Sequence, residues 1–161
     1  VPNIKGVEYA HQMLDVYPHL DEIGKDVIII GGGLVGSELA ATLAMKDHNV
    51  TIVEITEDIA RDDISIFKLR DYLEGMPNVT LMPETRCTEI KKDMVIVVGE
   101  DGTERELQAD MVILCVGFRS NNDSILPYFS ITPNVSMIGD LRRPASIREC
   151  EEEGYFSVSE T

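Results

Sequence analysis

The most informative segment of the sequence is Val27-Ile28-Ile29-Ile30-Gly31-Gly32-Gly33-Leu34-Val35-Gly36. Its first four residues are apolar and β-branched, which is typical of a short strand buried on both faces of a parallel sheet. The glycines follow without a break, and an apolar stripe of helical period then runs through Val35, Leu39 and Leu43. The segment therefore predicts a strand, a tight glycine loop and a helix.

The loop contains the pattern G-x-G-x-x-G, which binds the pyrophosphate of a dinucleotide when a strand precedes it and a helix follows. Gly31 then permits the sharp turn, Gly33 lets the backbone approach the pyrophosphate, and Gly36 lets the helix lie close to the strand. The free N–H groups and the positive end of the helix dipole attract the anion. A glycine-rich turn without a ligand is the alternative interpretation.

Two other classes of protein also use a glycine-rich loop. Methyltransferases usually place an acidic residue just before the first glycine, where this chain has Ile28, Ile29 and Ile30, so a dinucleotide is favoured. Kinases and P-loop proteins are excluded because no Gly-Lys-Ser/Thr follows the loop.

Glu54 ends the second predicted strand, residues 50–53. An acidic residue at this place in a dinucleotide-binding fold accepts hydrogen bonds from the adenosine ribose and repels a 2′-phosphate. Glu54 therefore favours NAD over NADP, while Arg61, further along the chain, is a candidate partner for a 2′-phosphate. An incidental glutamate at a strand end is the alternative.

Two further positions have both a functional and a plain interpretation. Glu38 is expected in the first turn of the glycine-loop helix, where a carboxylate complements the helix dipole without any ligand. Gly117 ends the last apolar strand, residues 111–116, and ligands bind at the carboxyl ends of parallel strands. An ordinary turn also explains this glycine. No nucleophile and base have the spacing of a catalytic triad or dyad, so no catalytic residue is predicted.

The rest of the chain predicts an α/β fold. Strands at 50–53 and 79–82 alternate with helices, and the second helix is expected around Ile66, Leu69 and Leu73. Consecutive strands follow near 88–90, 94–98 and 104–107, with a hairpin turn at Asp101-Gly102, before the return strand at 111–116. We expect a Rossmann-like parallel sheet with helices on both faces and a small antiparallel β-meander.

The two ends of the chain are expected to form segments of their own. Residues 1–25 predict a lead-in with a short helix that Pro18 ends, and its apolar face comprises Ala10, Met13, Leu14 and Tyr17. Residues 26–133 form the nucleotide-binding domain, and residues 134–161 form a tail. In the tail we expect a strand at 135–138, then Gly139-Asp140, then a helix that Ser146 caps and that ends near Gly154.

Composition and charge describe an ordinary soluble globular chain. Its 161 residues are 43% hydrophobic and 27% charged, and 14 basic against 29 acidic residues give a net charge of −15. Such a charge repels nucleic acid and anionic membranes. No apolar run reaches the roughly 20 residues of a membrane span, and no signal segment is recognisable, so we expect a cytoplasmic protein. The three cysteines and three histidines lack metal-ligand spacing.

With these motifs in place, the sequence resembles the NAD(P)H-binding domain of the pyridine nucleotide-disulfide oxidoreductase (FAD/NAD-linked reductase) superfamily. The similarity is strongest to the carboxyl-terminal part of Old Yellow Enzyme-type 2-enoate and 2,4-dienoyl-CoA reductases, the NADH:flavin oxidoreductases. The stretches that carry the resemblance are residues 2–6, 27–38, 50–60, 109–121 and 135–140.

The resemblance implies an NADH-binding domain that positions the nicotinamide for hydride transfer to FAD, in a parent enzyme that reduces enoate-type C=C bonds. It implies that the pyrophosphate lies on the glycine loop, the adenosine ribose at Glu54, and the nicotinamide near Glu38, Val116 and Gly117. Asp140 would bond the ribityl chain of the flavin. The complete set of implied cofactor-binding residues is Gly31, Gly32, Gly33, Leu34, Val35, Gly36, Glu38, Glu54, Ile55, Val116, Gly117, Gly139 and Asp140.

Parts of the family pattern have no counterpart in this sequence, namely the first glycine fingerprint that holds FAD, the cysteine pair, the Fe–S cysteines and the FMN barrel. We therefore expect the tail to belong to a flanking FAD domain, FAD to bind only in the intact parent, and this fragment to be inactive alone. A stand-alone NAD(H)-sensing or regulatory module is the alternative, and a weaker one is FAD bound in the chain's own glycine loop.

Overall fold

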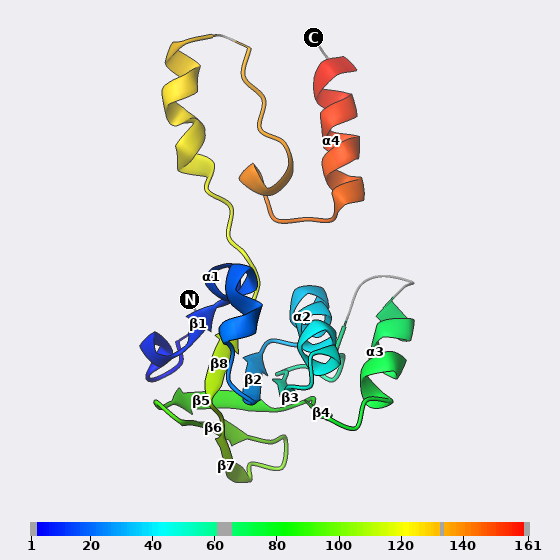
Figure 1. Cartoon of the computed structure of the whole chain (residues 1–161). Helices are drawn as coiled ribbons and strands as arrows, with labels where there is room; N and C mark the ends of the chain where they lie inside the picture. Colours follow the sequence, from blue (N-terminus) through cyan, green and yellow to red (C-terminus); the bar gives the residue numbers. More distant parts are fainter. Residues whose placement is uncertain (1–2, 61–65, 133, 160–161) are drawn as a thin grey trace. The chain divides into compact units, whose positions relative to one another are not determined.

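The computed structural model describes residues 3–60, 66–132 and 134–159 of the chain (Figure 1). The chain divides into two compact units, residues 1–117 and residues 118–161. None of the helices in the described part of the chain is long and apolar enough to cross a membrane.

Within its described residues, the first unit is built on a five-stranded parallel sheet of order β1-β8-β2-β3-β4. Strand β2 (Asp26–Ile30) lies at the centre, between β8 (Met111–Leu114) and β3 (Asn49–Val53). Strands β1 (His11–Gln12) and β4 (Val79–Met82) form the two edges. Residues 27–30 of β2 are buried, as the unbroken apolar run predicts for a strand covered on both faces.

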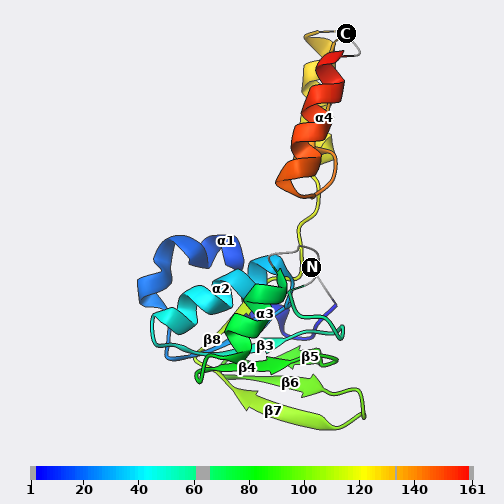
Figure 2. The same cartoon turned by 90° about the vertical axis from the view of Figure 1, so that its right-hand side faces the viewer.

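Helices cover one face of this sheet. They are α1 (Met13–Val16), α2 (Leu34–Met45) and α3 (Ile66–Glu74), and Figure 2 shows all three on the same side of the parallel strands. Ile29 and Ile52 of the sheet pack there with Leu39 and Leu43 of α2 in one core cluster. The 3.6-residue spacing of the apolar side chains of α2 directs them onto the sheet.

A second sheet covers the other face. Among the described residues it has three antiparallel strands, β5 (Arg86–Ile90), β6 (Met94–Val98) and β7 (Glu104–Gln108), in that order. Ile28, Ile30 and Val53 pack against this layer in a second cluster, together with Val95 and Val97. The α/β class, the parallel sheet and the β-meander are thereby confirmed, and the second face is covered by the meander and by the short 3₁₀ helix η1 (Val7–Tyr9).

The lead-in differs from its prediction. Helix α1 has only four residues and passes at Tyr17 into the 3₁₀ helix η2 (Tyr17–Glu22), which contains Pro18. Leu14 is 64% exposed and Tyr17 is 56% exposed, so the predicted apolar face was wrong at these two positions. The helix is too short to present a face of two full turns to the core. Strand β1 was not predicted from the sequence, because two residues carry no strand pattern and β1 is defined only by its pairing with β8.

The hairpin turn at Asp101-Gly102 is confirmed. Gly102 has φ +77°, a conformation that glycine adopts at no steric cost. The Asp101 carboxylate accepts a hydrogen bond from the Thr103 amide at 2.9 Å, which closes the turn.

The second unit contains the 3₁₀ helices η3 (Asn122–Ser130) and η4 (Gly139–Leu141) and the α-helix α4 (Ile147–Ser159). The predicted strand at 135–138 was wrong, since no described strand of this unit offers an edge with which these residues could pair. Ser146 caps α4 as expected: its Oγ accepts from the Glu149 amide at 3.3 Å, and Glu149 Oε2 accepts from the Ser146 amide at 3.0 Å. The helix continues beyond Gly154, so the predicted end was too early.

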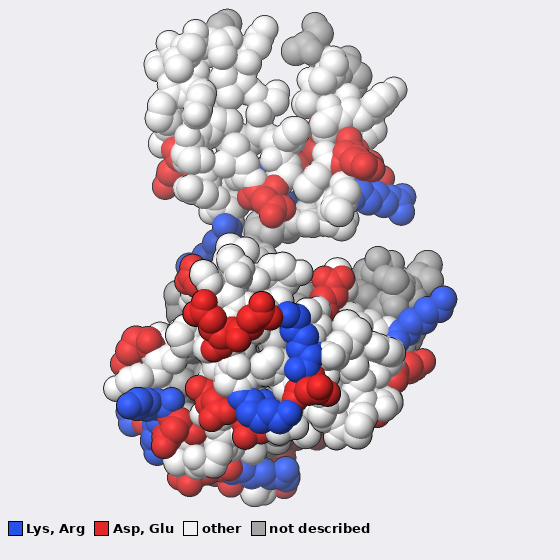
Figure 3. All heavy atoms as spheres, in the orientation of Figure 1, with Lys and Arg blue, Asp and Glu red and all other residues white. Residues whose placement is uncertain are grey.

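Acidic side chains lie close to basic ones on the surface of the first unit. On the face drawn in Figure 3, Lys and Arg side chains are interspersed among Asp and Glu. Lys46 pairs with Asp21 at 2.7 Å, and Lys5 pairs with Glu89 at 2.9 Å. Surface pairs of this kind are worth less than about 1 kcal/mol each.

Candidate functional site

The glycine loop joins the carboxyl end of β2 to the first turn of α2. Gly31 has φ +105°, and its N–H donates to the Val53 carbonyl at 2.9 Å. A Cβ at this position would lie 2.4 Å from the Cys115 carbonyl oxygen. The fold therefore requires glycine at position 31, with or without a ligand.

Gly36 brings the helix close to the loop. A Cβ there would lie 2.0 Å from the Gly31 carbonyl oxygen and 3.2 Å from Cys115 Cβ. Any side chain at position 36 would push α2 away from the end of β2. This glycine also has a packing reason that is independent of any ligand.

Gly33 lacks both of these reasons. It caps the N-terminus of α2 with φ −65° and ψ −175°, an extended conformation that any residue can adopt. A Cβ at this position would meet nothing within 4 Å, so it would project into open space. The loop thus leaves free space next to a backbone position that every amino acid could occupy.

The N-terminus of α2 faces this space without a side-chain cap. No side chain bonds the helix N-terminus at the cap position, and no acidic residue lies in the first turn. The amides of the first helical turn have no carbonyl partner within the helix, and they carry the positive end of the helix dipole. Glu38 lies beyond the first turn because the helix begins at Leu34, so the expectation that it sits in that turn was wrong.

Glu54 is held in place by three hydrogen bonds. Its Oε2 accepts from the Gly32 amide at 2.7 Å, and its Oε1 accepts from the Thr56 amide at 2.8 Å and the Thr56 hydroxyl at 2.9 Å. A carboxylate can accept about four hydrogen bonds, so capacity remains for a further donor. The half-buried side chain is therefore oriented before any ligand arrives.

The Gly32 carbonyl fastens the loop from its other side. It accepts from the Ser37 hydroxyl at 3.1 Å and from the Ala60 amide at 2.6 Å. Ser37 is fully buried, so its hydroxyl has a structural role and is not a nucleophile. These bonds, together with that from Gly32 to Glu54, make the loop rigid.

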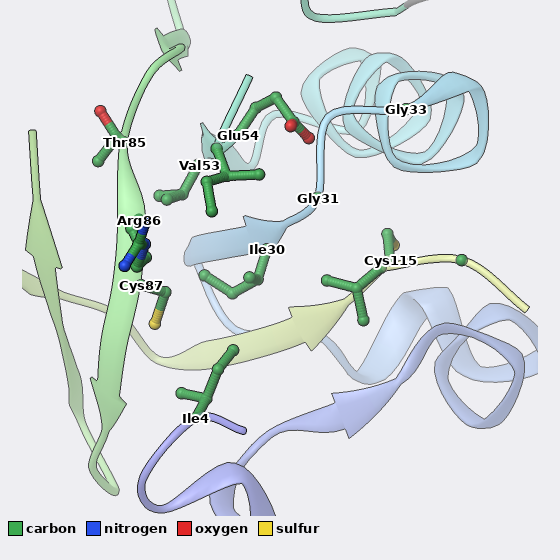
Figure 4. Close-up of a pocket in the computed structure, with 13 residues that line it drawn as sticks. Ile4, Ile30, Gly31, Gly33, Val53, Glu54, Thr85, Arg86, Cys87 and Cys115 are labelled. Atoms are coloured by element: carbon green, nitrogen blue, oxygen red, sulfur yellow. The ribbon is translucent and has the colours of Figure 1, made fainter. Parts of the chain in front are cut away.

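Gly31, Gly33 and Glu54 border a cleft of about 450 Å³ at the carboxyl ends of β2, β3 and β8 (Figure 4). The implied site residues that line it are Gly31, Gly33, Glu54, Ile55, Val116 and Gly117. The other lining residues are Ile4, Ile30, Val53, Thr85, Arg86, Cys87 and Cys115.

The other cofactor-binding residues that the resemblance implies do not line the cleft. Gly32 is the buried residue of the glycine loop. Leu34, Val35 and Gly36 begin α2, and Glu38 is exposed on that helix. Gly139 and Asp140 belong to η4 in the second unit. There the Gly139 amide donates to Glu153 Oε2 at 2.8 Å, and Asp140 is exposed and accepts from the Ala145 amide at 3.4 Å.

One wall of the cleft, formed by the lead-in and the start of β5, was not predicted from the sequence. Ile4, Thr85, Arg86 and Cys87 reach it only through the packing of the second sheet, for which the sequence holds no local signal. Arg61, the predicted candidate for a 2′-phosphate, lies outside the described residues, whereas Arg86 puts a cation in the cleft wall.

The cleft offers no activated nucleophile. Burial raises the pKa of the Cys87 thiol to about 11 and that of the Cys115 thiol to about 12, so both stay protonated at neutral pH. No group of three or more His, Cys, Asp or Glu side chains able to hold a metal ion occurs among the described residues.

The site has the features of a dinucleotide-binding α/β domain: a buried strand, a tight glycine loop, an uncapped helix N-terminus and a carboxylate at the end of the next strand. The chain belongs to the pyridine nucleotide-disulphide oxidoreductase family, whose model matches residues 1–154. FAD and NAD(H) are used in this family, and the family assignment supports an oxidoreductase.

The relatives are much longer than this chain. Bilirubin reductase of Mediterraneibacter gnavus is 32% identical over an alignment of 164 positions, which covers 99% of this chain and 25% of that protein. Cinnamate reductase of Clostridium sporogenes is 30% identical over 147 residues, which cover 89% of this chain and 22% of that protein. The chain thus spans a quarter or less of the length of these two relatives.

A solved structure has the same fold. The complex of 2-naphthoyl-CoA reductase with 2-naphthoyl-CoA superposes with a TM-score of 0.87 at 23% identity, over 96% of this chain and 24% of that one. At this identity the likeness establishes the fold and leaves the ligand to be argued from the residues.

Proposed function

We propose that the first unit binds NADH and positions its nicotinamide for hydride transfer to FAD within a longer flavin-dependent reductase. The observation that carries the proposal is the open space at Gly33, where neither conformation nor packing explains a glycine. A bound pyrophosphate does explain it, because a phosphate oxygen can reach the backbone only where no side chain intervenes.

The loop and α2 would hold the pyrophosphate through backbone groups alone. The uncapped amides of the first turn of α2 point toward the N-terminal end of the helix, where the dipole favours negative charge. Gly31 and Gly36 keep the loop tight, and Glu54, Ser37 and Ala60 hold it through Gly32. The anion site is therefore preorganised, and binding would cost little ordering of the backbone.

Glu54 would select NADH over NADPH. Its carboxylate is fixed by the Gly32 and Thr56 donors and retains capacity to accept from the hydroxyls of the adenosine ribose. A 2′-phosphate at the same place would meet this negative charge at close range. Arg86 in the cleft wall would attract a 2′-phosphate. The preference for NADH over NADPH therefore depends on whether Glu54 or Arg86 lies nearer the ribose.

The nicotinamide half of the cofactor is assigned to the end of β8. Val116 and Gly117 line the cleft there, and Ile55 lines it beside Glu54, near the adenosine end. Glu38, exposed on α2, is assigned to the carboxamide. Bound NADH supplies the hydride, and the residues of this chain bind and orient the cofactor.

The tail, residues 134–161, is proposed to belong to a flanking FAD domain. Asp140 is the residue assigned to the ribityl chain of the flavin, and its exposed carboxylate is available to a further donor. Because the rest of a flavin site has no counterpart in this sequence, we propose that FAD binds only in the parent protein and that this fragment is inactive alone. The similarity to cinnamate reductase supports reduction of an enoate-type C=C bond by the parent.

Calorimetric titration of the chain with NADH and then with NADPH tests the proposal. We expect saturable binding of NADH and at least tenfold weaker binding of NADPH, a difference of about 1.4 kcal/mol. Absence of binding to either nucleotide would contradict the proposed function. Tighter binding of NADPH would preserve the nucleotide site and contradict the role of Glu54.

A further inference from the structure

We propose that the first part of the lead-in, residues 3–10, belongs to the nucleotide site, and that Ile4 packs against a base ring of the bound dinucleotide. This inference rests on the function proposed above. It adds an apolar contact from a segment that the glycine fingerprint does not include.

Ile4 lines the same cleft as Gly33 and Glu54. Figure 4 shows it across the cleft from Val53 and Glu54, with Ile30 and Cys87 between them. Its side chain is partly buried and packs against the core cluster between the two sheets. Ile4 therefore presents part of its surface to the core and part to the cleft.

The backbone of residues 3–10 is hydrogen-bonded to β5, so the position of Ile4 does not depend on a ligand. The Lys5 amide donates to the Thr88 carbonyl at 3.3 Å, and the Ile90 amide donates to the Lys5 carbonyl at 2.8 Å. Lys5 Nζ also pairs with Glu89 Oε1 at 2.9 Å. These contacts hold Ile4, the residue before Lys5, at the cleft between the two sheets.

Gly6 permits this close docking. It has φ +74°, and a Cβ there would lie 1.9 Å from the Ile90 carbonyl oxygen. A larger residue at position 6 would force the segment away from β5 and carry Ile4 with it. The local sequence is therefore adapted to hold the segment against the second sheet.

The cleft has two chemically different sides, and a dinucleotide has groups that suit both. The glycine loop and Glu54 offer amides and a carboxylate, which suit a pyrophosphate and a ribose. Ile4 offers partly exposed aliphatic surface, backed by the buried Ile30 and Val53, and this suits the face of a planar base. With the polar side assigned to the phosphates and ribose, the adenine or nicotinamide ring remains for the apolar side.

Ile4→Ala tests the contact, and Val7→Ala is its matched control. Val7 lies in the same segment and packs on the same core cluster, but it is not among the residues that line the cleft. Calorimetry is expected to show about tenfold weaker NADH binding for Ile4→Ala, since losing methylenes from an apolar contact has effects of this size. Val7→Ala is expected to bind NADH within about twofold of the unchanged chain.

ADP-ribose, which lacks the nicotinamide, identifies the ring. Equal weakening of ADP-ribose and NADH by Ile4→Ala assigns adenine, and weakening of NADH alone assigns nicotinamide; both results support the contact. Thermal unfolding of each variant shows that affinities are compared between folded chains. Ile4→Val, which removes one methylene, replaces Ile4→Ala if the alanine variant does not fold, and its expected effect is about threefold.

The inference is overturned if the folded Ile4 variant binds NADH as tightly as Val7→Ala. This failure differs from failure of the proposed function, in which the unchanged chain does not bind NADH at all and both proposals fall together.

Discussion

Replacing Gly33 by alanine separates the stability of the glycine loop from its proposed ligand. The residue has φ −65°, and an added Cβ meets nothing within 4 Å, so alanine introduces neither strain nor a clash. Alanine restricts the unfolded chain, which stabilises by about 0.4–1 kcal/mol, but it is a poorer N-cap than glycine by about the same amount. The free energy of unfolding is therefore expected to change by less than about 1 kcal/mol.

The effect on binding should be much larger. The methyl group would occupy the open space that we assign to the pyrophosphate, and a phosphate oxygen could no longer reach the backbone. We expect Gly33→Ala to weaken NADH at least tenfold, equivalent to about 1.4 kcal/mol, and the bulkier Gly33→Val to weaken it about a hundredfold or more. Because ADP-ribose contains the same pyrophosphate, its affinity should fall in parallel.

Two control substitutions are expected to give different patterns. Gly102→Ala places a side chain at φ +77° in a hairpin turn, so it should lower stability by about 1 kcal/mol and leave NADH affinity unchanged. Gly36→Ala would put a Cβ 2.0 Å from the Gly31 carbonyl oxygen, so stability and binding should both fall. Urea unfolding measures stability, and calorimetry with NADH and ADP-ribose measures affinity. Wild-type affinity in a folded Gly33→Ala chain would refute the placement of the pyrophosphate at this loop.

The remaining predictions concern charge, thiols and the second unit. Glu54→Gln keeps an acceptor for Gly32 or Thr56 but removes the charge, so the ratio of NADPH to NADH affinity should rise about tenfold in calorimetric titrations; an unchanged ratio would exclude Glu54 as the selector. Burial raises the pKa of Cys87 to about 11 and that of Cys115 to about 12, so between the ordinary thiol pKa and these values the unfolded chain releases protons that the folded chain retains. The contribution of the buried thiols to the free energy of unfolding is therefore full below the ordinary thiol pKa of about 8.5 and falls as the pH rises above it. Urea midpoints should fall less over this pH range in a chain that carries both Cys87→Ala and Cys115→Ala. Glu153→Gln should weaken the bond to the Gly139 amide and speed its hydrogen exchange, while equal exchange rates would show that the carboxylate does not hold the turn.

The local part of the site was predictable from the sequence. A β-branched run, consecutive glycines and a helical apolar stripe follow one another in the chain, and they favour a strand, a tight turn and a helix in that order. Glu54 was predictable for a similar reason, because parallel strands place their carboxyl ends at one edge of the sheet. In these places local propensity and the fold agree.

The outer wall of the cleft was not predictable. Ile4 and Cys87 are far from the glycine loop in the chain, and they reach the cleft only because the second sheet packs on the parallel one. The error at 135–138 has a related cause, since a short segment such as Val135-Ser136-Met137-Ile138 becomes a strand only beside a strand edge with free N–H and C=O groups. Sequence pattern specifies a preference, and the partner supplied by the rest of the fold decides its outcome.

The three glycines of the fingerprint carry different kinds of evidence. Gly31 is explained by its positive φ and Gly36 by its contact with the loop, so both would be required in a strand–loop–helix unit that bound nothing. Gly33 has an ordinary conformation and open space beside it, so neither strain nor a clash requires the missing side chain, whereas a bound pyrophosphate does. A match to the whole pattern therefore reports mainly the fold, and the case for a bound nucleotide depends on Gly33 together with the carboxylate of Glu54, which three donors hold beside it.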